Sequence, residues 1–305
     1  MESYRMVGEK MKQLILGTVQ LGMNYGVNNR EGKPSIEEAF NILNTAYENN
    51  ICFLDTASAY GDSEKVIGNF IKKENKHFKI VTKLKKLDEN KDKIAQVEES
   101  LRDSLHNLCV SKIDYYLYHS FEDLINNKDV FQYLEELKKK GTIKKLGVSI
   151  YDPKELEYIL INLSDNIDFI QIPFNILDLR WLKDDLLKKT KDKNIEVAAR
   201  SIFLQGLFFA SNDTVNKIHP KAYEYITRLK DFSADKKVTI QQLVMSFVKQ
   251  QEDIDYLLVG CEDKEQLLNN ISNFNASIEF SQADLQYIYE SFWTIDKKII
   301  DPRQW

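Results

Sequence analysis

The sequence of 305 residues has little of what several protein classes require. Its three cysteines, Cys52, Cys109 and Cys261, are odd in number and far apart. We therefore expect reduced thiols of a cytoplasmic protein, two of them close to the core, rather than a disulfide framework. The four histidines show no metal-ligand spacing, which argues against a zinc site. No apolar run reaches about 18 residues, and the first residues lack the apolar core of a signal peptide.

Basic blocks and closely spaced glycines are also missing. The net charge is −5, and no stretch is strongly basic, so the sequence gives no indication of a nucleic acid or an anionic membrane as partner. Gly22 and Gly26 do not form the glycine fingerprint that an open doubly wound sheet uses to bind a dinucleotide. The expected partner is a small molecule.

Eight short apolar runs alternate with helical patterns along the chain. The helical patterns carry end signals: Ser35 with Glu38 three residues later is a capping-box pattern, Gly141 ends one helix, and Asp152 with Pro153 begins the next. Apolar runs of this length between helices are typical of buried parallel strands. The runs cover residues 14–18, 51–54, 78–82, 113–118, 143–149, 168–172, 195–200 and 254–259.

This alternation predicts an α/β fold, a (β/α)8 barrel, as one domain over residues 1–305. We expect extra helices before the last strand, near 221–231 and 239–251, and at the C-terminus, near 281–293. Residues 1–11 are expected to form an irregular segment ahead of the first strand. The alternative fold is an open doubly wound sheet, and the absent glycine fingerprint argues against it.

Charged and polar residues end three neighbouring runs. Asp55 follows the second run and Lys83 the third, Tyr60 lies in the loop between them, and His119 follows the fourth. The C-terminal ends of barrel strands face a common opening, so these side chains should converge there. The simpler interpretations are a structural ion pair between Asp55 and Lys83, a packing tyrosine and a core histidine.

The motifs around these residues resemble those of the aldo-keto reductases. The chain reads FLDTASAYGDSEKVIG, IVTKL and YYLYHS, and Asp55, Tyr60, Lys83 and His119 match the catalytic tetrad of that family. The resemblance extends from residues 16–18 to residues 259–261. It implies an NAD(P)H-dependent oxidoreductase that reduces an aldehyde or ketone to an alcohol. The segments RSIFLQGLFF and DPRQW resemble a branch linked to sugar and polysaccharide metabolism, which implies a sugar-like carbonyl substrate.

The four residues suit such a reduction. A carbonyl that accepts a hydride needs a proton at its oxygen, and Tyr60 is the candidate general acid. Because a free phenol has a pKa of about 10, we expect Lys83 to lower the pKa of Tyr60, with Asp55 holding Lys83 charged and oriented. A neutral His119 could donate a hydrogen bond to the carbonyl oxygen.

The resemblance also implies a set of cofactor contacts. Ser149 and Gln171 would bind the nicotinamide carboxamide, and the helix that begins after Asp263 would offer free N–H groups to a phosphate. The full set is Gly17, Thr18, Asp55, Ser149, Gln171, Arg200, Ser201, Gly206, Leu207, Gly260, Glu262, Lys264, Gln266 and Asn270.

The chain departs from the family pattern at three places. Ile150 replaces an asparagine that binds the carboxamide. Arg200 replaces an aromatic residue that stacks on the nicotinamide; its guanidinium can stack as well, but its charge should disfavour the oxidised cofactor. Glu262 and Asp263 stand where a basic or hydroxyl residue receives the 2′-phosphate, with Lys264 partly offsetting them. The family favours NADPH, and these charges leave NADH open.

Two other functions remain as alternatives. Lys83 could form a Schiff base in a lyase or aldolase. The chain could instead be a regulatory module that binds cofactor without significant turnover, as in the potassium-channel β-subunit branch. For the enzyme, we expect Met23, Tyr25, Tyr151, residues 206–220 and the C-terminal tail to surround the substrate. An epimerase that uses its bound cofactor catalytically is a variant of this interpretation.

Overall fold

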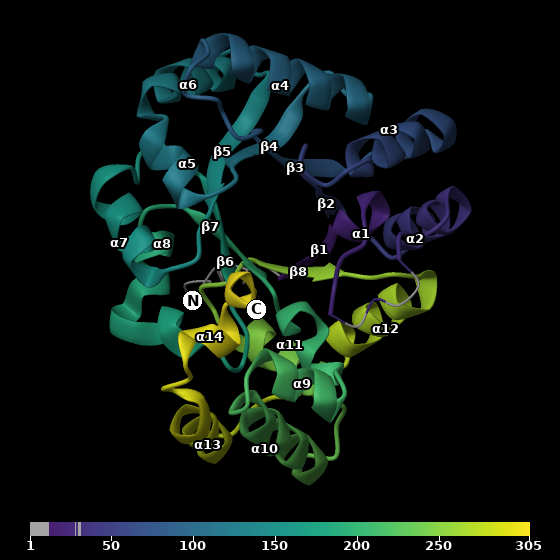
Figure 1. Cartoon of the computed structure of the whole chain (residues 1–305), viewed down its shortest axis with the longest axis vertical. Helices are drawn as coiled ribbons and strands as arrows, with labels where there is room; N and C mark the ends of the chain where they lie inside the picture. The colour runs from purple at the N-terminus through teal and green to yellow at the C-terminus, as the bar shows by residue number, and fades with distance from the viewer. Residues whose placement is uncertain (1–11, 28, 30–31) are drawn as a thin grey trace, which may run out of the picture.

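The computed structural model describes residues 12–27, 29 and 32–305, so the segment expected over residues 1–11 lies outside the described residues. Eight parallel strands form a closed barrel in sequence order (Figure 1). The prediction of a (β/α)8 barrel is therefore confirmed. The strands are β1 (Gln13–Gly17), β2 (Phe53–Asp55), β3 (Lys79–Lys83), β4 (Ile113–Tyr118), β5 (Ile143–Ser149), β6 (Phe169–Pro173), β7 (Glu196–Arg200) and β8 (Tyr256–Gly260).

The strand register brings the ends of distant segments together. Gly17 at the end of β1 pairs with Asp55 of β2 on one side and with Gly260 of β8 on the other, which closes the cylinder. Ser149 of β5 pairs with Gln171 of β6. Because all strands run in the same direction, these residues lie at the same end of the barrel.

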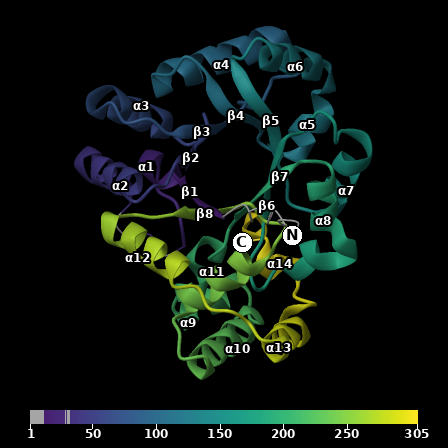
Figure 2. The same ribbon diagram turned by 180° about the vertical axis from the view of Figure 1, so that it is seen from behind.

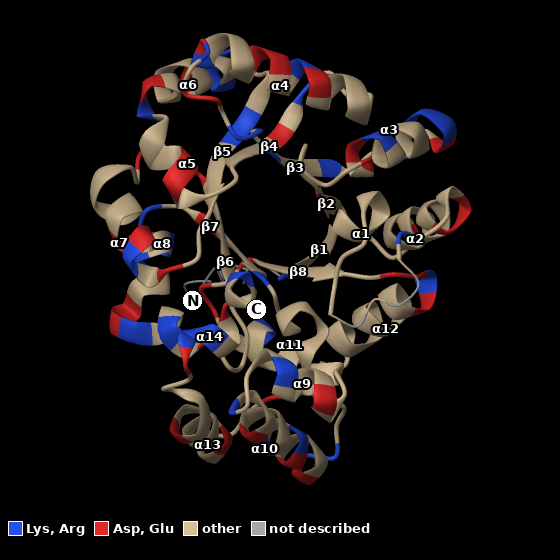
Figure 3. Cartoon of the chain, in the orientation of Figure 1, with Lys and Arg blue, Asp and Glu red and all other residues tan. Residues whose placement is uncertain are grey.

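Helices surround the barrel on all sides in both views (Figures 1 and 2), and many of the charged residues lie on them (Figure 3). The predicted extra helices are present: α9 to α11 precede β8, and α13 and α14 follow α12. The helices are α1 (Val19–Gly22), α2 (Ile36–Glu48), α3 (Ser63–Glu74), α4 (Lys93–Leu108), α5 (Phe121–Asn126), α6 (Phe131–Lys139), α7 (Pro153–Asn162), α8 (Leu186–Asp192), α9 (Asn212–Ile218), α10 (Ala222–Asp235), α11 (Ile240–Gln250), α12 (Lys264–Asn275), α13 (Gln282–Phe292) and α14 (Lys297–Ile300).

The helix-end signals are present with one correction. Ser35 caps α2 by accepting a hydrogen bond from the Glu38 N–H at 3.1 Å. The Glu38 carboxylate does not complete a capping box; it accepts a hydrogen bond from the Lys264 N–H at 2.8 Å instead. Asp152 does form a full capping box at the start of α7. Gly141 follows α6 with a φ of 77°, the left-handed conformation that ends many helices.

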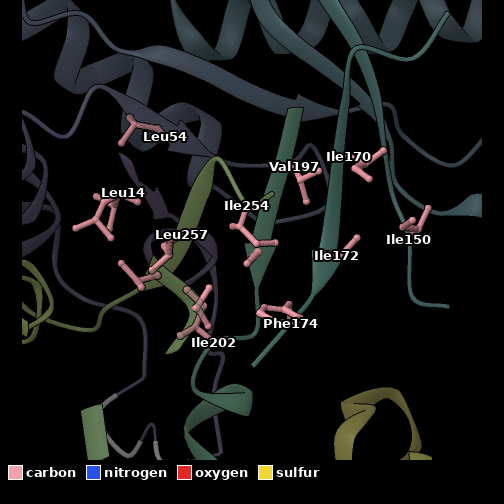
Figure 4. Packing of buried hydrophobic residues seen from close by; sticks show 14 of the residues in the cluster. Leu14, Leu54, Ile150, Ile170, Ile172, Phe174, Val197, Ile202, Ile254 and Leu257 are labelled. Atoms are coloured by element: carbon pink, nitrogen blue, oxygen red, sulfur yellow. The ribbon is translucent and has the colours of Figure 1, made fainter. Parts of the chain in front are cut away.

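Successive residues of each strand face two different layers of the core. Leu14 and Leu16 pack outward against the helices, whereas Ile15 between them points into the barrel. Figure 4 shows part of the outer layer, including Leu14, Leu54 and Val197. The outer layer packs the helices against the barrel. The side chains of the inner layer fill the interior of the barrel at one end.

Four aromatic rings fill the barrel near the start of its strands. They belong to Phe53, Tyr115, Phe169 and Tyr256, and their neighbouring ring centroids lie 4.8 to 5.9 Å apart. Three of these residues are the first residues of β2, β6 and β8. This packing closes one end of the barrel and leaves the polar side chains at the other end around an open space.

The cysteines differ from expectation. Only Cys261 is buried, whereas Cys52 and Cys109 are exposed because they lie just before β2 and just after α4. The expectation of two cysteines near the core is therefore wrong. Among the described residues, no helix is long and apolar enough to cross a membrane.

Replacing Gly147 by alanine tests the close approach of β5 to its neighbour. An added Cβ would lie 2.4 Å from the backbone oxygen of Phe169, so strand spacing would have to change. We expect Gly147→Ala to lower the free energy of unfolding by about 1–3 kcal/mol in a urea titration, the usual cost of overpacking. Ile161→Ala is the control, because that side chain is 81% exposed. Equal values for both variants would contradict the strand spacing described here.

Candidate active site

A cavity of about 460 Å³ opens where the strands end, within the range of small-molecule sites. Every strand contributes to its lining, either by its last residues or by the residue that follows it. The strand-end residues that line it are Gly17, Asp55, Lys83, His119, Ser149, Gln171, Arg200 and Gly260.

A buried ion pair lies at the floor of this cavity. The Lys83 Nζ atom lies 2.8 and 3.0 Å from the two carboxylate oxygens of Asp55, and the side chains of both residues are almost fully buried. The same ammonium donates to the backbone oxygen of Thr56 at 2.8 Å. The Gln171 amide donates to Asp55 from β6. The three N–H bonds of Lys83 are thus directed at oxygen atoms of β2 and its loop.

Tyr60 and His119 lie above this ion pair. Their ring centroids are 6.0 Å apart with an edge-to-face geometry, and the Lys83 Nζ atom lies 5.0 Å from the centroid of the Tyr60 ring. The structure thus places Asp55, Tyr60, Lys83 and His119 around one cavity. Their catalytic roles stay a prediction.

A chain of hydroxyl groups fixes the loop that carries Tyr60. Ser63 donates to the Thr18 hydroxyl at 2.8 Å, and the Thr56 hydroxyl donates to Ser63 at 2.9 Å. Gly22 touches the same loop so closely that an added Cβ would lie 1.7 Å from the Tyr60 backbone oxygen. Sequence reasoning assigned no role to Thr56, Ser63 or Gly22, although buried hydroxyl residues beside a loop glycine are a recognisable signal.

The environment of Tyr60 corrects one expectation. Burial raises the pKa of the phenol, the negative charge of Asp55 raises it further, and the cation of Arg200 opposes them. The expected lowering by Lys83 is not found, because that ammonium is directed at Asp55 and Thr56. Tyr60 therefore keeps its proton at neutral pH.

Burial is also the main influence on the pKa values of Lys83 and His119. Burial lowers the pKa of Lys83, and the Asp55 carboxylate opposes this effect. Burial, assisted by the nearby Lys83 cation, lowers the pKa of His119 to about 4. His119 is therefore neutral at neutral pH and can donate one ring N–H.

Most of the residues selected as cofactor contacts line the cavity. Leu207 and Lys264 do not: Leu207 is buried in the core and Lys264 is exposed. Tyr25 and Tyr151 line the cavity as expected, whereas Met23 does not. Phe209, in the expected segment 206–220, also lines it. The residues that sequence reasoning missed come mainly from the loops after β1 and β7 and from β8 and α12; they are Val19, Gln20, Gly26, Ile202, Phe203, Gln205, Gln241, Leu258, Val259 and Asn269.

Two amide groups fit the binding of a nicotinamide. The Oε1 atoms of Gln171 and Gln20 are buried, and neither has a hydrogen-bond partner among the described residues. A buried acceptor without a donor is costly, so a ligand N–H group at this place would satisfy it. The carboxamide of a nicotinamide carries such a group. The residues at this end of the cavity therefore fit a nicotinamide cofactor.

The far end of the cavity does not have the free N–H groups expected at the start of α12. The Lys264 N–H donates to the Glu38 carboxylate at 2.8 Å, and the Gln266 N–H donates to Asp263 at 2.7 Å. Two of the protein's own carboxylates thus occupy the place predicted for a phosphate, and Glu262 adds a third acid beside them. That expectation is wrong for these two N–H groups.

Arg200 brings a positive charge to the wall of the cavity. Its Nε atom donates to Ser149 at 3.2 Å, its Nη2 atom donates to the Ile150 backbone oxygen at 3.0 Å, and its Cζ atom lies 4.0 Å from the centroid of the Tyr151 ring. Across the described part of the chain, no carboxylate forms an ion pair with Arg200. Ile150 itself is fully buried and does not line the cavity.

The depressed pKa of His119 predicts a pH-dependent stability. The unfolded histidine, with a pKa of about 6.5, binds a proton as the pH falls, while the folded one stays neutral until about pH 4. The stabilisation is therefore complete above pH 6.5 and is lost between pH 6.5 and 4. For this partly exposed side chain, we expect a loss of about 1–3 kcal/mol.

Urea unfolding at pH 7 and pH 4 of the wild type and His119→Gln checks this. The variant should show the smaller pH dependence, because its side chain does not titrate. His77→Gln, at an exposed position, serves as the control. A wild-type pH slope that survives in His119→Gln would contradict the assignment.

Comparisons of the sequence with known proteins find reductases among its relatives. Rhazimal reductase 2 of Alstonia scholaris is 26% identical over 281 residues, which cover 84% of this chain and 81% of the relative. Aldo-keto reductase YhdN of Bacillus subtilis is 24% identical, covering 93% of this chain and 92% of the relative. The NADH-specific methylglyoxal reductase of Escherichia coli is 25% identical, covering 79% and 83%.

Solved structures share the fold. The holo form of the aldo-keto reductase AKR11C1 from Bacillus halodurans superimposes with a TM-score of 0.73 at 19% identity, covering 95% of both chains. An aldo/keto reductase from Klebsiella pneumoniae in complex with NADP and acetate gives a TM-score of 0.67 at 18% identity, covering 92% of both chains. The model of the Aldo/keto reductase family matches residues 13–291. The chain belongs to the aldo/keto reductase family.

Proposed function

We propose that this protein reduces an aldehyde or ketone to an alcohol, with Tyr60 as the general acid. The observation that carries the proposal is the convergence of a protonated phenol, a neutral imidazole and the Asp55–Lys83 ion pair on one cavity. Membership of a family of NAD(P)H-dependent reductases supports it. A nicotinamide dinucleotide supplies the hydride when it is bound.

Tyr60 suits the delivery of a proton because it holds one at neutral pH. An alkoxide is a stronger base than a phenolate, so a phenol with a raised pKa can still protonate the oxygen that forms on the substrate. The product is an alcohol, and Tyr60 is left as a phenolate. Neutral His119 lies edge-to-face with the Tyr60 ring. It donates an N–H to the same substrate oxygen and so orients the carbonyl.

The ion pair stabilises the charge that remains after proton transfer. The Lys83 cation lies 5.0 Å from the centroid of the Tyr60 ring and would attract a phenolate. Asp55 holds that cation in place. A Schiff base on Lys83 is disfavoured, because its nitrogen is fully buried and its N–H bonds are directed at oxygen atoms.

The residues at the two ends of the cavity favour particular forms of the cofactor. Ser149 and Gln171 would hold the carboxamide, and Arg200 beside them would disfavour the positive charge of an oxidised nicotinamide. At the other end, the carboxylates of Glu38, Glu262 and Asp263 would repel a 2′-phosphate. We therefore propose a preference for reduced cofactor and for NADH over NADPH.

A sugar-derived carbonyl is the substrate class that we propose. Tyr25, Tyr151 and Gln205 line the cavity and offer hydroxyl and amide groups that can bind a substrate rich in hydroxyl groups. Burial raises the pKa of Tyr25 to about 12, so this hydroxyl stays protonated and can donate. The proposal concerns the class of substrate and not an individual sugar.

Tyr60→Phe tests the general acid. The change removes the transferable proton and leaves the ring contacts with His119 and Lys83, so cofactor binding should remain near the wild-type value. We expect carbonyl reduction to fall by about 10²–10⁴-fold, the range attributed to general acid catalysis. Turnover with a panel of aldehydes and sugar carbonyls, together with fluorescence titration of NADH and NADPH, measures both effects. Tyr47→Phe, at an exposed site, is the control, and unchanged turnover in Tyr60→Phe would remove Tyr60 from the mechanism.

Glu262→Arg tests the origin of the cofactor preference. Reversing the charge at the acidic end of the cavity should improve the affinity for NADPH relative to NADH by about tenfold or more, since one charge pair near a protein surface can contribute several kcal/mol. The ratio of the two dissociation constants is the measurement. Glu265→Arg, three positions later in the first turn of α12, is a matched control, because Glu265 does not line the cavity. If both variants shift the ratio equally, Glu262 does not face the 2′ position.

A further inference from the structure

The end of the chain contacts the wall of the cavity. After α14, the 3-10 turn Pro302–Gln304 carries Arg303, whose Cζ atom lies 3.5 Å from the centroid of the Tyr151 ring. The Cζ atom of Arg200 lies 4.0 Å from the same centroid. Figures 1 and 2 show this C-terminal segment, in yellow, near β6 and β8. Of these three residues, Arg200 and Tyr151 line the cavity and Arg303 does not.

The two guanidinium groups lie on opposite faces of the Tyr151 ring. A guanidinium is planar and covers much of a phenol ring, so two such groups side by side on one face, both within 4.0 Å of the centroid, would overlap. The ring is therefore sandwiched between Arg200 on the cavity side and Arg303 on the tail side. Both contacts are of the cation–π type, which favours arginine over an aromatic face.

The two arginines differ in how their charges are compensated. Arg303 donates to both carboxylate oxygens of Asp301, at 2.8 and 2.6 Å, and Asp301 is 3% exposed. This bidentate pair fixes the guanidinium plane and neutralises its charge. Arg200 has no such partner in the described part of the chain, so its charge acts on the cavity. The tail thus contributes the fixed guanidinium plane of Arg303, and β7 contributes the uncompensated positive charge of Arg200.

Two other polar contacts among the described residues hold the backbone at Tyr151 rather than its ring. Lys297 of α14 pairs with Asp152 at 2.8 Å, and Arg180 donates to the Tyr151 backbone oxygen at 3.4 Å. These bonds fix where the side chain begins. The orientation of the ring then depends on the stack, and so does the guanidinium of Arg200 that rests on it.

We propose that Arg303 is a positioning residue, which acts through the Tyr151 ring to hold the Arg200 guanidinium at the reaction centre. The proposal rests on the proposed function and names the part of the tail that supports it. A shift of Arg200 would be felt at the reaction centre, since its charge influences the pKa values of Tyr60, Lys83 and His119. It should also alter the preference for reduced over oxidised cofactor.

Hydrogen exchange of the cofactor-free protein tests the stack itself. Arg303→Met keeps a long side chain but removes the cation and the planar group, and it should increase exchange in peptides covering residues 149–152 and 197–203. Lys297→Met is the matched control: it breaks the ion pair between the same tail and Asp152 without touching the ring. Unchanged exchange in Arg303→Met, or an equal increase in the control, would overturn the proposal.

A double-mutant cycle tests the action through Arg200. Dissociation constants of NADH, NAD+, NADPH and NADP+ are measured by fluorescence for the wild type, Arg303→Met, Arg200→Met and the double variant. In Arg303→Met the preference for the reduced form should fall by about two- to fivefold, the range that corresponds to one exposed cation–π contact. In the Arg200→Met background the same change should have no effect. An equal effect in both backgrounds would mean that Arg303 acts independently of Arg200, which would overturn the proposal.

Arg303→Lys keeps a cation over the ring and should recover part of the lost preference. It also replaces Arg303→Met in both measurements if that variant fails to fold. A wild-type protein that binds no dinucleotide would defeat the proposed function, and with it the role of Arg303 at the reaction centre. A protein that binds dinucleotide normally but shows no coupling between Arg303 and Arg200 would defeat only the proposal made here.

Discussion

The buried ion pair between Asp55 and Lys83 is the constraint on which the site depends. Removing two charges from water costs several kcal/mol per ion, so such a pair is stable only when its geometry is good and its other hydrogen bonds are satisfied. Here β2 and its loop provide the carboxylate and the Thr56 oxygen, β3 provides the ammonium, and β6 provides the Gln171 amide. Any displacement of these strands would leave a buried charge unpaired.

The two ends of the cavity carry opposite charges, and the neutral Asp55–Lys83 ion pair lies at its floor. The Arg200 cation faces the end where the reaction is proposed, and the carboxylates of Glu38, Glu262 and Asp263 lie toward the end near α12. In the proposed binding mode both ends would discriminate between charge states of the dinucleotide, one at its nicotinamide and the other at its ribose. A preference in cofactor can thus follow from residues that take no part in proton transfer.

Long-range supports hold this arrangement. The aromatic rings of Phe53, Tyr115, Phe169 and Tyr256 close the other end of the barrel, so polar groups gather at only one end. Gly22 and the hydroxyl groups of Thr18 and Ser63 hold the Tyr60 loop from β1 and α3. The C-terminal tail reaches the same site from the last residues of the chain, through the ring of Tyr151.

The sequence alone determined the barrel and the strand ends at which Asp55, Lys83 and His119 lie. The alternation of strands and helices is a local pattern, and in a parallel barrel the C-terminal ends of all strands lie at the same end. Tertiary structure decided what those patterns do not encode. The pKa of Tyr60 rises rather than falls because burial and the direction of the Lys83 N–H bonds outweigh simple proximity. The start of α12 offers no free Lys264 N–H because Glu38, which is 226 positions away, occupies it. The stack of Arg303 on Tyr151 joins residues that share no motif. Contacts between distant segments depend on packing in three dimensions, and no spacing in the sequence records them.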